Sequence, residues 1–354
     1  MKVLVRRSVV GTLLKIWLVL PALVIVACAT GAGTAQSEDG SGRPVDPAQP
    51  YRDFLDRQKQ FVLDELGPDG EPLVIHYSDN GRPANPAVVF VHGVPTSSWM
   101  FRKVIDELSE SRLRLIAPDN IGYGASSKPD PNRENAGEFF SPAAQSLRIE
   151  ALLDHLDVTS AVFVVHDVGG PILWELLERR PRMISGLVVL NTIGAPEGFA
   201  PPAALDDPLV QAIVEMVGVD DERTVADLVC GMVAEPEMLD TPEQLEGYLA
   251  GFREGSGSAY LAFLMNLDIV RDKLPSYRRA IASIDVPACV LWGSQDENLP
   301  ASPGAAWFAE TLGVDERDQY VIGDAKHLVA EEEPALIADL VRRTVDQAHD
   351  RDGP

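Results

Sequence analysis

Residues 161–171 read AVFVVHDVGGP, and this stretch decides the fold. The five residues 161–165 are apolar and mostly β-branched, which predicts a strand buried on both faces of a parallel sheet. A helix is expected to begin at Pro171. The turn between strand and helix holds Asp167 and two glycines. Ligands of open α/β sheets bind at the carboxyl ends of the strands, so Asp167 stands where chemistry is expected.

Short apolar runs alternate with amphipathic stretches on both sides of this turn. Further strands are expected at 73–77, 87–91, 113–117, 187–190, 288–292 and 319–322, and helices at 99–110, 143–156, 171–180, 304–312 and 334–348. This alternation predicts an α/β fold with a mostly parallel central sheet and helices on both faces. Residues 196–275 interrupt the alternation with helical periodicity and no clear strand, which predicts an inserted helical cap.

The composition excludes several classes of protein. The chain has 354 residues, 54 of them acidic and 30 basic, for a formal net charge of −24. Nucleic-acid binding needs clustered Lys and Arg, so we expect no nucleic-acid partner. Three cysteines without regular spacing predict no disulfide framework. No metal-ligand spacing such as HExxH or CxxC occurs, and no GxGxxG follows a strand. We therefore expect neither a metal nor a cofactor.

The N-terminus carries the features of an export signal. Residues 1–27 contain four basic residues and no acidic one, and a run of twelve apolar residues ends at Ala27. A membrane-spanning helix needs about 20 apolar residues, so a signal peptide is the preferred interpretation. The sequence IVAC at 25–28 resembles the lipobox of bacterial lipoproteins, which implies lipidation of Cys28. An ordinary signal peptide of a periplasmic or secreted protein is the alternative, and an uncleaved anchor is another.

The small, polar, Pro- and Gly-rich residues after Cys28 predict a flexible linker. Arg6 and Arg7 leave open whether export follows the general or the twin-arginine route. Membrane contact is expected only through the N-terminal lipid or anchor. The domain prediction is a signal peptide at 1–27, a linker at 28–50, a core at 51–195, a cap at 196–275 and the rest of the core at 276–348.

Five sequence blocks follow five of the expected strands, in one order and at plausible spacings. They are HGVPTSSW at 92–99, PDNIGYGASSKP at 118–129, HDVGG at 166–170, GSQD at 293–296 and GDAKH at 323–327. HDVGG resembles the nucleophile elbow of α/β-hydrolases, in which small residues flank the nucleophile because the strand turns sharply into the helix. Together the blocks resemble the α/β-hydrolase superfamily, in its haloalkane dehalogenase and epoxide hydrolase branch. An Asp at the elbow disfavours an ordinary serine esterase.

The resemblance implies a catalytic triad in the chain order nucleophile, acid, histidine. Asp167 is the implied nucleophile, which attacks an sp³ carbon and forms an alkyl-enzyme ester. His327 is the implied general base for hydrolysis of that ester, and Asp296 the acid that orients it. The strand expected at 187–190 ends in Asn-Thr and not in an acid, which favours Asp296. The backbone N–H groups of Val94 and Val168 are the implied oxyanion hole.

The leaving-group site departs from the dehalogenase pattern. Dehalogenases commonly hold the halide with an indole N–H directly after the nucleophile and with an Asn or a second Trp, whereas this chain has Val168 and Val94 and no Trp in the cap. Epoxide hydrolases use cap tyrosines as acids, and the cap offers Tyr248 and Tyr260. The resemblance also gives His92 and His166 supporting positions.

Three functions remain open from the sequence. The first is haloalkane dehalogenase-like hydrolytic substitution, the second is epoxide hydrolysis with cap tyrosines, and the third is a non-catalytic surface binding protein. Residues 197–272 carry 16 acids against three arginines, a charge of −13. An acidic cap above a carboxylate nucleophile disfavours anionic substrates. A small neutral organic molecule and water are therefore the expected partners.

Overall fold

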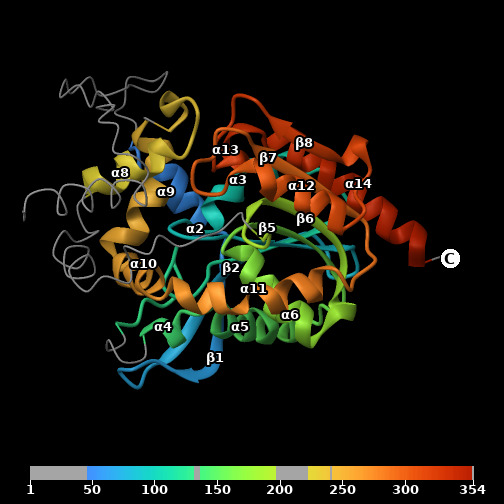
Figure 1. The fold of residues 1–354 in the computed structure, drawn as a ribbon. Coiled ribbons are helices and arrows are strands. Elements are labelled where there is room, and N and C mark those ends of the chain that lie inside the picture. Colours follow the sequence, from blue (N-terminus) through green and yellow to red (C-terminus); the bar gives the residue numbers. More distant parts are fainter. Residues whose placement is uncertain (1–45, 131–135, 197–221, 240, 353–354) are drawn as a thin grey trace, which may run out of the picture.

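An eight-stranded sheet runs through the part of the chain that the computed structural model describes, residues 46–130, 136–196, 222–239 and 241–352 (Figure 1). Its strands are β1 (Lys59–Leu66), β2 (Pro72–Asn80), β3 (Ala87–Val91), β4 (Arg114–Pro118), β5 (Ala161–Asp167), β6 (Ile184–Thr192), β7 (Ala288–Gly293) and β8 (Gln319–Ile322). The order across the sheet is β1-β2-β4-β3-β5-β6-β7-β8. Only β2 breaks the parallel arrangement, since it pairs antiparallel with both β1 and β4. The predicted fold class is confirmed.

Helices cover both faces of the sheet. They are α2 (Gln49–Leu55), α3 (Arg102–Glu107), α4 (Ala136–Phe139), α5 (Pro142–His155), α6 (Gly169–Arg179), α8 (Glu222–Gly231), α9 (Pro242–Arg253), α10 (Ser256–Met265), α11 (Leu267–Ile281), α12 (Ala301–Thr311), α13 (Val329–Glu332) and α14 (Pro334–Asp352). Short 3₁₀ turns occur at Ser98–Phe101, Pro181–Met183, Pro236–Met238 and Glu316–Asp318.

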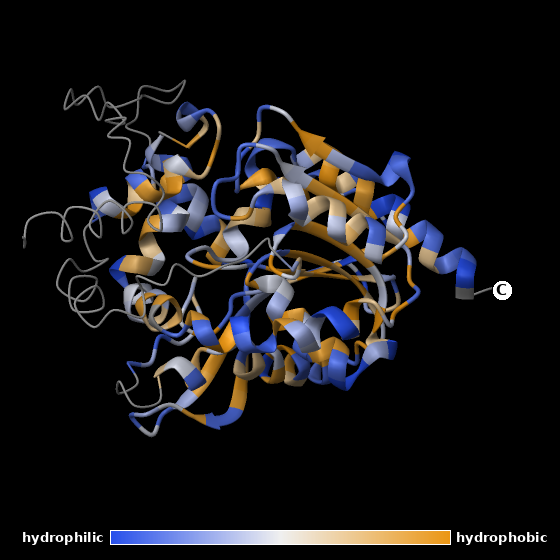
Figure 2. Cartoon of the chain, in the orientation of Figure 1, coloured by the Kyte–Doolittle hydropathy of each residue, from blue (hydrophilic) through white to orange (hydrophobic). Residues whose placement is uncertain are grey.

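Successive residues of the strands fill two separate cores. In β3, Val88 and Phe90 join the cluster that includes α3 and α14, whereas Val89 and Val91 join the cluster that includes α6, α11 and α12. The side-chain period of two in a strand produces this division. Figure 2 shows the result as apolar strands enclosed by helices with hydrophilic outer surfaces. The continuous apolar runs in the sequence are therefore strands with both faces buried.

All seven strands expected from the sequence form, but β1 was not among them. Its residues KQFVLDEL lie at the edge of the sheet, and only Leu63 is buried. An edge strand with one weakly buried face carries neither a continuous apolar run nor a regular alternation. Strand β1 therefore forms because it pairs with β2, although its own sequence pattern is weak.

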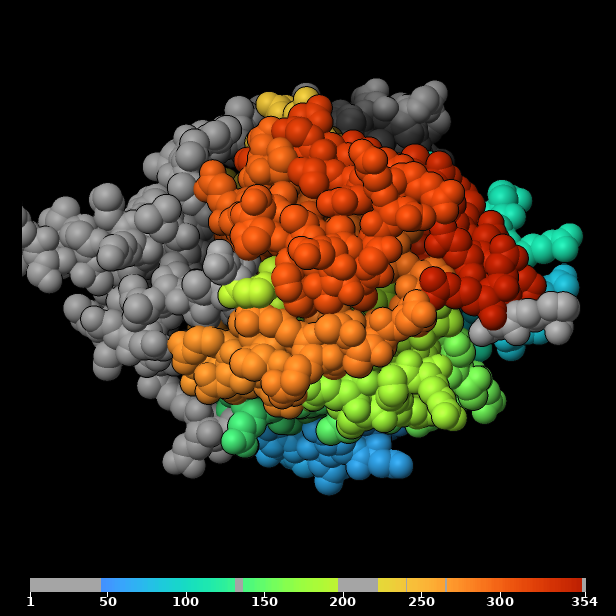
Figure 3. All heavy atoms as spheres, turned by 45° about the vertical axis from the view of Figure 1, so that its right-hand side comes forward, coloured from blue at the N-terminus to red at the C-terminus, as the bar shows by residue number. Residues whose placement is uncertain are grey.

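Two predicted domain boundaries require correction. The linker expected at 28–50 ends too late, because helix α2 already begins at Gln49. The cap boundary at 275 falls inside α11, which continues to Ile281 across Pro275. Helix α11 packs along α6 of the core (Figure 3), and Tyr277 donates a hydrogen bond of 2.8 Å to the buried Glu175 of α6. The amphipathic pattern continues through the boundary because the same helix serves cap and core.

The cap helices rest on the loop that follows β3. The indole Nε1 of Trp99 donates to the carbonyl oxygen of Gln244 in α9, at 3.3 Å. A Cβ added at Gly247, also in α9, would lie 2.5 Å from the Trp99 ring, so only glycine permits this approach. Tyr51 and Phe54 of α2 contact the same indole edge to face. Trp99 therefore joins the cap to the core and is not part of a leaving-group site.

Some of the predicted features lie in residues that the structure does not describe. Two other expectations concern membrane-spanning helices and metal sites. The signal peptide, Cys28 and most of the linker lie outside the described residues. Within the described ranges, no helix is both long enough and apolar enough to cross a membrane. The same part of the chain contains no group of three or more His, Cys, Asp and Glu side chains arranged to hold a metal ion.

Candidate active site

Asp167 occupies a sharp turn between β5 and α6. Its φ is 52°, in the left-handed region that non-glycine residues rarely adopt. A Cβ at Gly169 would lie 2.1 Å from the carbonyl oxygen of Val91, and one at Gly93 would lie 2.3 Å from Oδ1 of Asp167. The glycines thus let β3 and β5 bring their ends together around one carboxylate. The strain at Asp167, of order 1–3 kcal/mol, persists because the packing of α6 fixes the turn.

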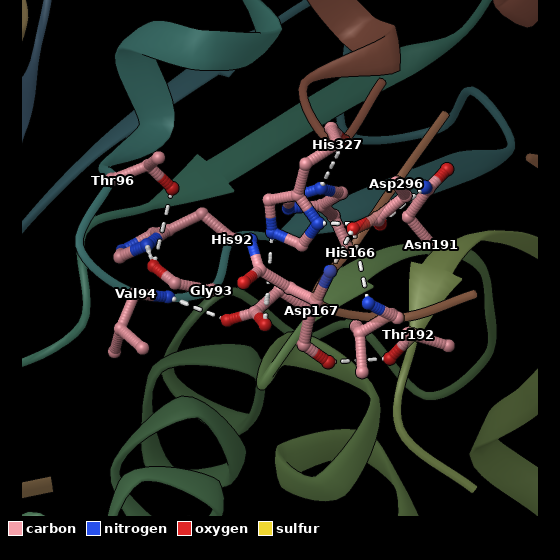
Figure 4. Close-up of polar contacts among 12 residues, drawn as sticks. His92, Gly93, Val94, Thr96, His166, Asp167, Asn191, Thr192, Asp296 and His327 are labelled. Atoms are coloured by element: carbon pink, nitrogen blue, oxygen red, sulfur yellow. Dashed lines mark hydrogen bonds and ion pairs between the residues drawn. The ribbon is translucent and has the colours of Figure 1, made fainter. Parts of the chain in front are cut away.

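The carboxylate of Asp167 is buried and faces two backbone amides. The N–H of Val94 donates to Oδ1 at 2.9 Å, and the backbone amide of Val168 also acts on the carboxylate by lowering its pKa. The hydroxyl of Thr192 donates to the main-chain carbonyl of Asp167. Burial raises the pKa of Asp167, while the charge of His327 and the two amides oppose the rise. Of the amides predicted as an oxyanion hole, that of Val94 is hydrogen-bonded to the predicted nucleophile (Figure 4).

His327 lies between the two predicted carboxylates. Its Nδ1 is 2.8 Å from Oδ2 of Asp296, and its Nε2 is 3.8 Å from Oδ2 of Asp167. Burial disfavours the imidazolium, but the charge and hydrogen bond of Asp296 and then the charge of Asp167 raise the pKa of His327 to about 9. The three residues predicted from the ends of β5, β7 and β8 thus form one constellation (Figure 4).

Asp296 is fixed more completely than Asp167. Its Oδ1 accepts from the backbone N–H groups of Asn298 and Leu299 at 2.9 and 3.0 Å, and its Oδ2 accepts from Asn191 and His327 at 2.6 and 2.8 Å. Burial would raise the pKa of Asp296, but the charge of His327 and these hydrogen bonds hold it below its ordinary value. Asp296 is therefore a permanent anion that orients the imidazole.

Asn191, at the end of β6, is a site residue that the sequence analysis did not assign. Its φ of 27° suits Asn better than most residues. The amide nitrogen donates to Asp296, and the amide oxygen accepts from the backbone N–H of Gly293 at 3.1 Å. The signal was present in the sequence as an amide, in place of an acid, at the end of the strand beside β7. Because the Asn191 side chain is uncharged, it holds the Asp296 carboxylate by a hydrogen bond and leaves the negative charge of Asp296 to act on the His327 imidazole.

His92 and His166 are buried and support the loops around the triad. The backbone N–H of Asn120 donates to Nε2 of His92 at 2.9 Å, so the proton of that ring is on Nδ1, which donates to the carbonyl of Gly93. His166 donates from Nε2 to the carbonyl of His327 at 2.8 Å. Burial, followed by the charge of His327, lowers the pKa of His166 to about 3. Both rings are therefore neutral structural groups.

The two cap tyrosines occupy different environments. The hydroxyl of Tyr248 donates to Glu331, whose carboxylate also pairs with Arg102, so this proton is committed away from Asp167. Burial and then the charge of Asp167 raise the pKa of Tyr260. Burial and then the charges of Tyr260 and Asp167 raise the pKa of Tyr123, whose buried hydroxyl has no hydrogen-bond partner in the part of the chain that the structure describes. Tyr123 belongs to the 118–129 block and was not assigned from the sequence.

The Asn191→Asp variant tests the positioning of Asp296. A second carboxylate 2.6 Å from Asp296 shares its site, so one of the two pKa values is raised in the folded state. A raised carboxyl pKa costs stability in full above that pKa, and the cost shrinks as the pH falls towards the unfolded-state pKa of about 3.9. We expect the unfolding free energy to drop by about 2 kcal/mol at pH 8 and by only about 0.5 kcal/mol at pH 4.

Urea denaturation at both pH values measures this effect. Asn298→Asp is the matched control, because the exposed Asn298 contacts Asp296 only through its backbone N–H. An equal loss of stability at pH 8 and pH 4 in Asn191→Asp would contradict the proposed contact.

Comparisons with known proteins agree with this geometry. A family model described as the alpha/beta hydrolase fold matches residues 86–219. A haloalkane dehalogenase of Mycolicibacterium paratuberculosis is 33% identical over 141 residues, which is 40% of this chain and 43% of that protein. A cis-3-alkyl-4-alkyloxetan-2-one decarboxylase of Shewanella oneidensis is 38% identical over 140 residues, 39% of this chain and 41% of that protein. The matched regions thus span about two fifths of the length of these curated relatives.

The likeness to solved structures extends over more of the chain. The crystal structure of a haloalkane dehalogenase from Bradyrhizobium elkani is 25% identical with a TM-score of 0.62, and the match covers 83% of this chain and 99% of that one. The sequence blocks, the sheet order and the position of Asp167 agree with these relationships. The chain has the α/β-hydrolase fold, and over about two fifths of its length its sequence is similar to that of a haloalkane dehalogenase.

Proposed function

We propose that this protein is a hydrolase of the haloalkane dehalogenase type, which substitutes a leaving group at an sp³ carbon through an ester on Asp167. The observation that carries the proposal is the division of labour at this carboxylate. Its Oδ1 accepts the N–H of Val94, whereas its Oδ2 is the oxygen nearest Nε2 of His327. One oxygen is thus held as the future ester carbonyl, and the other is the better nucleophile.

In the first step, Oδ2 of Asp167 forms a bond to the substrate carbon as the carbon–leaving group bond breaks. The leaving group departs with the bonding electrons, and Asp167 becomes a neutral alkyl ester. This removes one of the negative charges that raise the pKa of His327 in the free protein. The pKa of the imidazole therefore falls when the ester forms, so a larger fraction of His327 is the neutral base needed next.

In the second step, His327 takes a proton from water as the water oxygen attacks the ester carbonyl carbon. The negative charge develops on Oδ1, to which the amide of Val94 already donates, with the amide of Val168 as the second proposed donor. Collapse of this intermediate breaks the ester bond and passes the proton from His327 to the departing alcohol. Asp167 leaves this step as a carboxylic acid, and loss of its remaining proton through His327 to water restores the carboxylate. Asp296 stabilises the imidazolium throughout and is not itself protonated.

The His327→Gln variant should stop the reaction between these steps. Without a base, the alkyl ester on Asp167 accumulates, because the first step needs only the carboxylate. Incubation with a panel of bromoalkanes and terminal epoxides, followed by peptide mass spectrometry, should find the alkyl mass on the peptide that contains Asp167. Asp167→Asn in the same background is the control and should remain unlabelled.

The panel also tests the alternative class of function. No adduct on the variant and no turnover by the wild-type protein with any compound would contradict the enzyme proposal. That outcome would favour a non-catalytic binding protein on the same fold.

A specific observation favours epoxides as a second substrate class. An alkoxide leaving group needs a proton or a strong donor, and the raised pKa values of Tyr123 and Tyr260 keep both phenols protonated. The hydroxyl of Tyr123 is buried without a hydrogen-bond partner among the described residues, an arrangement that costs about 1–3 kcal/mol unless another group such as a ligand accepts its hydrogen bond. Val94 and Val168 carry no side-chain donor for a halide. We therefore propose that these two phenols hold the leaving group.

The Tyr260→Phe and Tyr123→Phe variants should affect epoxides more than bromides. Alkylation of Asp167 by an epoxide is expected to slow about 10²-fold or more in each, since removing a positioned acid costs that much. The ratio of epoxide to bromide rates should stay unchanged in Tyr248→Phe, whose hydroxyl serves Glu331. Equal slowing of both substrate classes in Tyr260→Phe would reject the acid role and indicate a packing role.

The acidic cap and the N-terminal segment support two further parts of the proposal. The charge of −13 at 197–272 favours a neutral substrate, as a carboxylate beside the leaving group would be repelled. The basic and apolar residues 1–27, followed by Cys28, support export and a lipid anchor in the cell envelope.

Cys28→Ser tests the anchor. In a bacterial host the wild-type protein should fractionate with membranes and begin at a lipidated Cys28, whereas the variant should lose the lipid. A wild-type protein whose mature N-terminus lies beyond Cys28 would instead indicate a periplasmic or secreted form.

A further inference from the structure

A short piece of the cap contacts the loop that carries His327. We call residues 231–234, which comprise the last residue of α8 and the three that follow it, the cap strap. The carbonyl oxygen of Met232 accepts two hydrogen bonds, from the backbone N–H of His327 at 3.0 Å and from that of Leu328 at 2.9 Å. The Nζ of Lys326 donates to the carbonyl of Gly231 at 3.3 Å. The cap is therefore bonded to the main chain of the proposed general base.

Glu332 joins the strap to the other side of the same loop. One oxygen of its carboxylate accepts the backbone N–H of Ala234 in the strap at 2.6 Å, and the other accepts the backbone N–H of Lys326 at 2.9 Å. Both oxygens thus bind amides, one from the cap and one from the residue before His327. A carboxylate in this bridge fixes the distance between strap and loop.

The remaining backbone groups of the loop are held by the core. The carbonyl of Lys326 accepts from Asn191, and the carbonyl of His327 accepts from His166. Every backbone N–H and C=O of Lys326 and His327 therefore has a partner, and the cap strap supplies the one for the N–H of His327. Since an unpaired buried amide is costly, this N–H depends on the strap for its hydrogen bond.

We propose that the cap strap and Glu332 hold His327 in the geometry of a general base, with Glu332 as a positioning residue for ester hydrolysis. The inference rests on the role proposed above for His327. It makes the cap part of the hydrolytic apparatus in addition to a cover for the substrate. If the strap moves away, His327 and Leu328 lose their shared acceptor, so the water-activating geometry exists only while the strap is seated.

Because Glu332 is charged, its removal should change the pKa of His327. The loss of a purely structural bridge would leave that pKa unchanged. The groups that act on the His327 imidazole are Asp296, Asp167, Glu332 and His166, and the three carboxylates favour its protonated form. Glu332→Gln removes one negative charge and replaces one acceptor oxygen by an amide N–H₂ that cannot accept. The titration midpoint of His327 should move to lower pH, by about half a unit.

NMR titration of histidine-labelled protein measures this midpoint without any substrate. Glu333→Gln is the matched control, because it removes the same charge one residue further along, and its midpoint should stay within about 0.1 pH unit of the wild type. Equal midpoints in wild type and Glu332→Gln would overturn the proposal. The titration separates this inference from the proposed function, since it gives a result even if no substrate is turned over.

The kinetic consequence should be confined to the second step. In Glu332→Gln, alkylation of Asp167 should proceed at the wild-type rate, while hydrolysis of the ester slows about tenfold or more, so that the adduct becomes detectable at steady state. An equal loss in both steps would show general disruption of the site and would contradict a positioning role for hydrolysis.

Hydrogen exchange of the wild-type protein tests the strap even if the variant fails to fold. As denaturant rises, the peptide that contains 326–328 should lose protection together with the peptide that contains 231–234, before the β7 peptide does. Protection of 326–328 up to the same denaturant concentration as β7 would mean that the core alone holds the loop, and the proposal would be rejected.

Discussion

The site depends on keeping two carboxylates and one imidazole charged while all three are buried. Removing an isolated carboxylate from water costs several kcal/mol, so each must be compensated by its surroundings. Asp296 receives four hydrogen bonds, and its pKa is lowered. Asp167 receives fewer, and its pKa is raised. Asp296, which accepts more hydrogen bonds, is thereby suited to support the imidazole, and Asp167, which accepts fewer, is suited to its proposed role as the nucleophile. Two residues of one type differ in role because their environments differ.

The positions of the triad were predictable because the topology determines them. Parallel strands end at one edge of the sheet, so an Asp at the end of β5, an Asp three residues after β7 and a His five residues after β8 are brought to that edge. The oxyanion amides follow from the same rule, since they belong to the turns themselves. These predictions required strand ends only, and the apolar runs locate the ends of β5, β7 and β8 to within two residues.

Other features of the site were not predictable because they depend on contacts between distant segments. Asn191 looks like an ordinary strand residue until β7 is placed beside it and its amide meets Asp296. Tyr248 and Tyr260 have equal standing in the sequence, yet one hydroxyl is committed to Glu331 and the other residue feels the charge of Asp167. The edge strand β1 and the continuation of α11 past Pro275 likewise result from packing partners and not from local pattern.

The bonds between the cap strap and the His327 loop also bear on how such enzymes can be recombined. Cap exchange between relatives is usually imagined as a change of substrate pocket on a constant catalytic core. Here the chain after α8 and the residues around Glu332 form one hydrogen-bonded unit, although about 100 positions separate them in sequence. A chimera that imports a foreign cap would need to import Lys326, Glu332 and their neighbours with it. This hydrogen-bonded unit therefore limits where a chimera can cross from one parent to the other. The chain after α8 and the residues around Glu332 must come from the same parent if His327 is to keep its position.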